Sequence, residues 1–524
     1  MQKLILLLIF SITLNALEIL EIKDDFKSVS GSDYMYYMKD QNRTLKASDI
    51  LKKENLKKVP KGGQMKPSFG PFWSKLKIKN SSQKVQNLIL YNKVPGINYI
   101  DVFIYKDKKL KTSYLLGDMR EQDNKKYLNR YSLFELTLLA NEEITIVSKV
   151  ENFNINNISW FIQTPSIFLN EESKTLIILG IAGGFFLLFL LLNTILFTIY
   201  RTVTYLIIAL HTLMSFLYMF SINGILYHID IELNLDFITA IAWVAPMFGT
   251  ILLLLFPYYY FNMKENYFKT SIVIRILIFL NLLFVFFHIY GFYYEPFYLT
   301  IAMLAGLVIG VTTIVLFLIG LYVKEIGSKY YLLGQLILLI AVTLNSLAIF
   351  GVIPYNENYR YMVTVAVSLD MILLLIAQYQ KTQHNIKNLK DNKEMLINQS
   401  HLTSIGQAIE HIVHQWKTPL TQIGTSVTLI ETSMHHDKKN LNKNLEIQIP
   451  KISMFLSLMK KTIDEFSNYY SKNMKKEFFE VKKIIYDIEN LFRSKIILKN
   501  AKVIVNIDNG ATCKFNPSKL ANIL

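Results

Sequence analysis

Seven long apolar segments in the middle of the chain constrain its fold more than any other feature. Each has about 20 residues or more, the length that a helix needs to cross the hydrocarbon core of a bilayer. They lie near residues 176–199, 203–226, 237–260, 270–292, 298–323, 330–353 and 360–379. With a hydrophobic fraction of 52%, they predict a multi-pass membrane protein whose seven-transmembrane domain, residues 176–379, is surrounded by membrane lipid.

Charges in the connecting loops predict the orientation of these segments. If residue 18 onward is exported, the outer loops carry only one basic residue, Arg360. The inner loops carry Arg201, Lys264, Lys269, Lys324 and Lys329. Because basic loops stay in the cytoplasm, we expect an external N-terminal domain and a cytoplasmic C-terminus. The formal net charge is +16, but the basic residues form no long tract, so no nucleic-acid partner is expected.

Residues 1–16 have the pattern of a secretory signal peptide: Lys3, an apolar run that ends at Leu14, and the small residue Ala16. An uncleaved anchor is the alternative, because Leu14 makes an imperfect cleavage site. In either case residue 18 onward is exported. The single cysteine, Cys513, rules out an intramolecular disulfide.

Residues 18–170 alternate between apolar and polar side chains in short runs, the pattern of strands. The clearest runs are Val85–Tyr91, Tyr99–Tyr105, Leu133–Leu139, Glu143–Val150 and Ile158–Ile162. Many short strands predict an exported β-sandwich. The string Gly70-Pro71-Phe72-Trp73, and Gly117-Asp118 before Arg120 and Arg130, resemble the sensor domain that precedes seven-helix modules in bacterial diverse intracellular signalling receptors.

This resemblance implies a periplasmic domain with a jelly-roll fold that binds a small molecule such as a carbohydrate. Aromatic rings stack on sugars and arginines pair with carboxylates. The candidate pocket residues are Trp73, Arg120, Arg130 and Trp160. The alternative is that the tryptophans are core residues and the arginines solvated surface residues.

Few polar side chains interrupt the apolar segments: Asn193, His211, Arg275, Asn281, Asn345 and Asp370. A transporter would need several acidic or histidine side chains at matching depth. Isolated groups instead predict hydrogen bonds between helices, and for Asp370 a role in packing or signalling is favoured over ion binding.

A helix that leaves the membrane over residues 380–400 leads into two heptad patterns, which span residues 401–471. In the first, Ile409, Ile412, Trp416 and Pro419 advance by steps of three and four; the second runs from Leu445 to Tyr470. Two such helices joined by the polar stretch Glu431–Asn444 predict a hairpin, and two hairpins a homodimeric four-helix bundle. An extra apolar row supports the bundle: Val413, Leu420 and Val427.

His414 falls on the outermost face of the first heptad helix, in the string His414-Gln415-Trp416-Lys417-Thr418-Pro419-Leu420. This string resembles the phosphoacceptor box of dimerising histidine kinases. The resemblance implies that His414 is phosphorylated and passes the phosphoryl group to a response regulator. It also implies that Thr418 holds a water for dephosphorylating the regulator. Pro419 removes a backbone hydrogen bond and is expected to kink the helix just after His414. Gln415 replaces the usual acidic residue and is expected to orient the imidazole.

Residues 477–524 resemble the first strand, helix and second strand of the ATP-binding lobe of histidine kinases, with Lys502–Ile507 as a strand and a helix opening at Phe515. Glycine-rich ATP-lid motifs are absent from the sequence, so ATP and Mg²⁺ would be bound by a domain largely missing from it. We expect a truncated copy of a complete kinase. A kinase-dead receptor phosphorylated by a partner is the alternative.

The predicted fold is a multidomain membrane protein: an exported jelly-roll-like β-sandwich, a seven-helix bundle, a cytoplasmic helical hairpin and an incomplete α/β ATPase lobe. The predicted function is that of a sensor histidine kinase of the seven-transmembrane 7TMR-DISM receptor type, in the inner membrane of a bacterium. No cofactor or metal site is expected within the chain itself.

Overall fold

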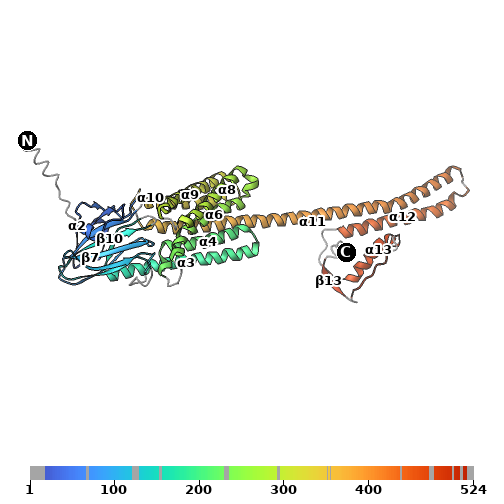
Figure 1. The fold of residues 1–524 in the computed structure, drawn as a ribbon. Coiled ribbons are helices and arrows are strands. Elements are labelled where there is room, and N and C mark those ends of the chain that lie inside the picture. Colours follow the sequence, from blue (N-terminus) through green and yellow to red (C-terminus); the bar gives the residue numbers. More distant parts are fainter. Residues whose placement is uncertain are drawn as a thin grey trace, which may run out of the picture. The chain divides into compact units, whose positions relative to one another are not determined.

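The computed structural model divides the chain into two compact units, Met1–His384 and Asn385–Leu524 (Figure 1). The described residues are 18–66, 70–120, 129–152, 156–228, 235–291, 295–350, 352–354, 356–436, 439–470, 477–498, 501–507 and 511–515. The predicted signal peptide, residues 1–16, lies outside them.

In the N-terminal β domain the described strands form two sheets. The larger has the strand order β4-β3-β5-β10-β7-β8, with β1 running parallel to β5; the smaller has the order β2-β11-β6-β9. The strands of the larger sheet are β1 (Ile19–Ile22), β3 (Met35–Lys39), β4 (Lys57–Lys58), β5 (Phe72–Asn80), β7 (Tyr99–Lys106), β8 (Lys109–Leu116) and β10 (Glu143–Glu151). Those of the smaller sheet are β2 (Ser28–Ser30), β6 (Gln86–Tyr91), β9 (Leu133–Leu138) and β11 (Phe161–Gln163).

Period-two alternation explains why these segments pair as a sandwich. In β7, Ile100, Val102 and Ile104 point into a core that also contains Leu90 and Phe134 of the smaller sheet. Four of the five predicted strand runs are confirmed by β6, β7, β9 and β10. The fifth is confirmed only in part, because β11 begins at Phe161 rather than at Ile158.

A short helix, α2 (Ala47–Lys52), covers the outer face of the larger sheet. Its residues Ala47 and Ile50 pack with Trp73, Tyr105 and Val147. Lys75, on the same face of the sheet, donates hydrogen bonds from Nζ to the carbonyls of Leu51 and Lys53, at 2.7 and 3.1 Å. These bonds occupy carbonyls that the end of a helix leaves unpaired.

Among the residues that the structure describes, seven helices are long and apolar enough to cross a membrane, as the sequence predicts. They are α3 (Pro165–Tyr200), α4 (Val203–Ile222), α6 (Leu235–Tyr260), α8 (Phe268–Gly291), α9 (Glu295–Tyr322), α10 (Ser328–Ile349) and α11 (Asn358–His436). The short helices α5 (Ile225–His228) and α7 (Met263–Asn266) lie between them. Helix α4 packs against α3 and α6, and α9 packs against α8 and α10.

Some polar side chains of the bundle form the predicted bonds between helices. Asn281 of α8 accepts a hydrogen bond from Thr250 of α6 at 3.0 Å. His211 of α4 contacts the carbonyl of Gly249 in α6, at 3.1 Å. Asn193 instead donates to the carbonyl of Phe189 in its own helix, at 2.8 Å. The amide therefore pairs one turn back, where an acceptor is always within reach.

In the second unit, the C-terminal part of α11 pairs with α12 (Leu441–Tyr470) as a hairpin. Two polar contacts align the helices: Ser426 donates to Gln448 at 3.0 Å, and Asn444 donates to Ser433 at 2.7 Å. The predicted loop Glu431–Asn444 is mostly helical, because α11 continues to His436 and α12 begins at Leu441. Its polar side chains lie mainly on exposed helix faces.

The rest of the second unit contains β12 (Glu477–Glu480), α13 (Val481–Leu498) and β13 (Thr512–Phe515). The predicted strand Lys502–Ile507 is wrong: β12 pairs with β13 instead, with Glu477 opposite Phe515. An alternating pattern becomes a strand only when a neighbouring backbone offers hydrogen bonds. Here β13, and not Lys502–Ile507, forms those hydrogen bonds with β12. Phe515 belongs to this strand, and the rest of the predicted helix, from residue 516, lies outside the described residues.

Candidate functional site

The predicted phosphoacceptor segment lies on α11 with its polar side chains outward. His414, Gln415 and Thr418 are exposed, whereas Trp416 is half-buried and Pro419 is buried. Thr418 follows His414 by four residues, so the two share one face of the helix. The imidazole is therefore accessible to a large reaction partner, and the hydroxyl lies one turn away.

Pro419 lies inside α11 without ending it. Proline has no N–H, so the carbonyl of Gln415 loses its usual helical donor. Trp416 has a similar mismatch, because its indole Nε1 is buried without a hydrogen-bond acceptor in the described part of the chain. Both groups lie within two residues of His414 along α11.

The two tryptophans proposed for a ligand pocket are both buried, on opposite faces of the larger sheet. Trp160 is 1% exposed in the core between the sheets, and its Nε1 donates to Ser148 at 3.0 Å. Trp73 is 3% exposed beneath α2, with its ring stacked on Phe103. Neither ring offers a free face to a sugar, because neighbouring apolar side chains already cover both.

Arg120 lines a small polar cavity of about 250 Å³ on the outer face of the larger sheet. Its guanidinium donates to Asp101 at 2.5 Å and lies 5.4 Å from the ring of Tyr99. Lys149 and Glu151 of β10 complete the lining. Both signs of charge and one aromatic ring converge here, which suits a small polar ligand.

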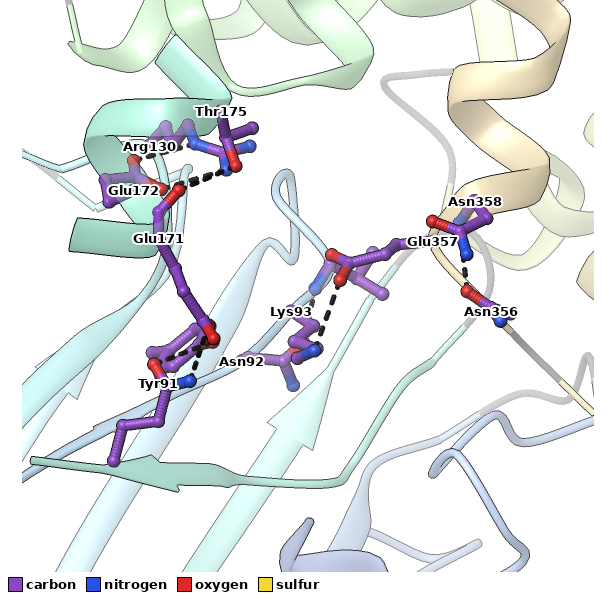
Figure 2. A network of polar contacts seen from close by, with 12 residues as sticks. Tyr91, Asn92, Lys93, Arg130, Glu171, Glu172, Thr175, Asn356, Glu357 and Asn358 are labelled. Carbon is purple, nitrogen blue, oxygen red and sulfur yellow. Dashed lines mark hydrogen bonds and ion pairs between the residues drawn. The ribbon is translucent and has the colours of Figure 1, made fainter. Parts of the chain in front are cut away.

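Arg130 has a different environment. It lies in a buried contact between the β domain and the first membrane-length helix. Its Nε and Nη2 donate to the two carboxylate oxygens of Glu172 in α3, at 2.7 and 2.9 Å. The two side chains are 1% and 9% exposed. Figure 2 shows the guanidinium directed at Glu172. The structure therefore does not bring Trp73, Arg120, Arg130 and Trp160 together.

The electrostatics of Arg130 follow from this pairing. Burial acts to lower the pKa of Arg130, but its hydrogen bonds to Glu172 and the neighbouring charges outweigh burial and raise that pKa. A planar guanidinium and a carboxylate joined by two parallel bonds form the strongest kind of protein ion pair. Removing one member of a buried pair typically costs about 3–5 kcal/mol. Arg130 and Glu172 thus form a firm attachment.

A second ion pair joins the β domain to the seventh membrane-length helix. Nζ of Lys93, which follows β6, lies 3.2 Å from Oε1 of Glu357, immediately before α11 (Figure 2). These side chains are 32% and 26% exposed, and Lys93 also lies over the ring of Phe161 at 3.8 Å. A partly solvated pair of this kind contributes about 0–1 kcal/mol. This ion pair to α11 is therefore much weaker than the Arg130–Glu172 pair to α3.

Apolar packing strengthens the attachment to α3 and α4. Phe168 of α3 packs edge-on against Tyr91, 5.0 Å between ring centroids, and both belong to a cluster with Tyr131. Gly224, after α4, has a φ of +73°, and a Cβ there would lie 2.5 Å from the carbonyl oxygen of Arg130. Only glycine fits this turn, because both its backbone angle and its close contact exclude a side chain.

Lys93, Glu172 and Glu357 were not among the residues predicted from the sequence. One signal pointed toward them: Glu171 and Glu172 are two carboxylates at the start of an otherwise apolar helix, and Glu357 immediately precedes another. Their partners lie 42 and 264 residues away along the chain.

No group of three or more His, Cys, Asp or Glu side chains that could hold a metal ion occurs in the described ranges.

Two family models match the chain. Residues 175–381 match the model described as 7TM diverse intracellular signalling, and residues 32–164 match the model described as 7TMR-DISM extracellular 2. The first covers the membrane-length helices and the second covers most of the β domain. No curated protein matches the chain.

Proposed function

We propose that this chain, which carries the extracellular and seven-helix domains of 7TMR-DISM signalling receptors, is a two-component sensor histidine kinase. In this proposal a small molecule binds the β domain, and the bundle transmits that event to α11. His414 then receives a phosphoryl group from ATP and passes it to an aspartate of a response regulator. The observation that carries the proposal is an exposed histidine beside a buried proline, on a hairpin helix that begins within the bundle.

The chemistry needs an accessible imidazole. A neutral ring nitrogen of His414 would attack the γ-phosphorus of ATP, forming the N–P bond while the bond to the β–γ bridging oxygen breaks and ADP leaves. The phosphoryl group must later reach a carboxylate on another protein, which a buried side chain could not do. In this proposal the Mg²⁺–nucleotide site belongs to an ATP-binding lobe rather than to the hairpin helices.

Gln415 and Thr418 have supporting roles in the proposal. Gln415 is exposed beside His414 and its amide can hold one imidazole tautomer by a hydrogen bond, although an amide is a poor base. Thr418 is exposed on the same face as His414 and can hold a water near the phosphorylated aspartate of the regulator. The pair would therefore tune transfer and dephosphorylation without supplying the nucleophile.

The surface of the hairpin supports a homodimer. Val413, Leu420 and Val427 recur every seven residues on α11 and are 62%, 54% and 41% exposed, and Ile409 is 48% exposed. A continuous apolar row of this kind is unfavourable in water and is buried when two hairpins form a four-helix bundle. We infer that a second copy of the chain covers the row.

The distribution of charge supports an inner-membrane protein with the β domain in the periplasm. Arg201, Lys264 and Lys324 are exposed in connections between membrane-length helices. Basic loops of this kind remain in the cytoplasm. The hairpin with His414 would then share the compartment of ATP and the response regulator.

The two attachments of the β domain suggest how a signal travels. Arg130 and Glu172 join the β domain to α3 through a buried pair, whereas Lys93 and Glu357 join it to α11 through a partly exposed one. A shift in the β domain that ligand induces would break the weaker contact first. Because the chain is helical from Asn358 to His436, α11 is the element that joins this contact to the phosphoacceptor segment.

Analysis of the phosphorylated residue tests the proposal. We expect the full-length chain, recovered from membranes of its host, to carry an acid-labile and base-stable phosphoryl group that His414→Gln abolishes and His411→Gln retains. His411 lies one turn before His414, which makes it a matched control. A phosphoryl group that persists in His414→Gln contradicts the proposal. Labelling of His414 only by a separate kinase would instead identify a receptor and phosphotransfer scaffold.

A further inference from the structure

Asp370 of α11 and Gln335 of α10 face each other inside the bundle, and each residue is 0% exposed. Gln335 Nε2 donates to Asp370 Oδ1 at 2.9 Å. The other oxygen of each group, Asp370 Oδ2 and Gln335 Oε1, has no hydrogen-bond partner within the described residues. Two buried acceptors without donors, in a pair already joined by one bond, require an explanation.

An ionised carboxylate is costly at this position. A charge within membrane-length helices needs a counterion or several donors, and the amide of Gln335 supplies one bond. Each polar atom left buried without a partner adds a further cost. An ionised Asp370 would therefore leave one charge and two lone acceptors uncompensated.

One proton removes all three difficulties. If Asp370 Oδ2 carries a hydrogen, that O–H can donate to Gln335 Oε1 while Gln335 Nε2 continues to donate to Oδ1. Acid and amide then form a ring closed by two hydrogen bonds, with no net charge and no unpaired oxygen. We propose that Asp370 is a proton-binding site, and that its neutral carboxyl and Gln335 form a latch between α10 and α11.

The backbone around the latch is shaped to receive the carboxyl group. A Cβ at Gly334 would lie 2.3 Å from Asp370 Oδ1, so any side chain there would displace the acid. The titratable neighbour on α10 has another partner, because Tyr331 donates to the carbonyl of Leu316 at 3.3 Å. The residue after Asp370 makes a neutral contact with α4, because the hydroxyl of Thr212 donates to the sulfur of Met371 at 3.7 Å.

Infrared difference spectroscopy of the full-length chain in lipid nanodiscs tests the proton directly. Wild type minus Asp370→Asn at neutral pH should show the carbonyl band of a protonated carboxyl group, because every other acidic group cancels. The band should move to higher wavenumber in Gln335→Leu, where the acid loses its amide partner. Ser368→Ala, which removes a bond within α11 alone, should leave it unchanged. Carboxylate bands in place of the carbonyl band overturn the proposal.

Thermal unfolding of the same samples tests the latch. Asp370→Asn keeps one donor and one acceptor for the amide of Gln335, so its unfolding midpoint should match wild type. Asp370→Leu removes both and should lower the midpoint, as should Gly334→Ala, which pushes the acid aside. Equal midpoints for Asp370→Asn and Asp370→Leu overturn the latch even where the infrared band is present.

Discussion

Arg130 and Glu172 join the β domain to α3 through two parallel hydrogen bonds, of 2.7 and 2.9 Å, between side chains that are 1% and 9% exposed. Glu172→Gln should therefore leave a buried guanidinium without its counter-charge and destabilise the junction by about 3–5 kcal/mol. Hydrogen exchange at the amides of β9 measures this loss. Glu18→Gln is the matched control, because its ion pair with Lys58 is half-exposed and should contribute less than about 1 kcal/mol. Equal effects of the two changes would refute the buried anchor.

The Lys93–Glu357 pair should govern signalling more than stability. Glu357→Lys replaces an attraction at 3.2 Å with a repulsion, at a cost of about 1 kcal/mol, and is expected to shift the level of phosphorylation at His414. Adding Lys93→Glu restores opposite charges and should restore the wild-type response to ligand. A double variant that behaves like the single variant would show that the contact has no part in the relay.

Glu142 should make the β domain sensitive to acid. Burial acts to raise its pKa, but hydrogen bonds from the Leu139 amide and from Lys111 and Lys106 outweigh burial and lower it from 4.5 to about 2. A lowered pKa stabilises the fold above pH 4.5, and the contribution, about 3 kcal/mol, is lost as pH falls from 4.5 toward 2. Hydrogen exchange of β10 at several pH values should show this slope, and Glu142→Gln should flatten it. An unchanged slope would assign the acid sensitivity to other carboxyl groups.

Thr418→Ala should slow dephosphorylation of the response regulator and leave phosphorylation of His414 intact. A water that loses its orienting hydroxyl reacts more slowly, by roughly tenfold to a hundredfold. The loss of label from a phosphorylated regulator, timed with the full-length chain, gives the rate. Thr421→Ala is the control, because Thr421 is also exposed but its hydroxyl bonds the carbonyl of Lys417. Identical rates for wild type and Thr418→Ala would remove the phosphatase role.

Leu420→Lys should weaken the homodimer. Leu420 is 54% exposed in one chain and is expected to be buried between two, where an added charge costs several kcal/mol. Light scattering of the detergent-solubilised chain should show a dimer dissociation constant raised at least about tenfold, which corresponds to 1.4 kcal/mol. Gln422→Lys adds the same charge to an exposed polar position of α11 and should leave the dimer intact. A stable Leu420→Lys dimer would place the interface elsewhere.

Local patterns in the sequence were sufficient to predict most of the helices and strands. The seven membrane-length helices follow from the length of each apolar run, and β6, β7, β9 and β10 follow from period-two alternation. The same kind of reasoning failed where the outcome depended on a distant partner. Lys502–Ile507 alternates like a strand, but β13 pairs with β12 in its place. The stretch Glu431–Asn444 is polar enough for a loop but is largely helical, because an exposed helix face accepts the same residues.

The amino-acid sequence by itself determined the order of the parts, the membrane-spanning segments and the position of His414 on a heptad helix, because each depends on residues a few places apart. Only the tertiary structure decided what Trp73, Arg130 and Asp370 contact. Residue type does not distinguish a core tryptophan from a ligand-binding one, or a solvated arginine from a buried anchor. Those roles depend on Glu172, Phe103 and Gln335, which chain folding brings from 30 to 42 residues away.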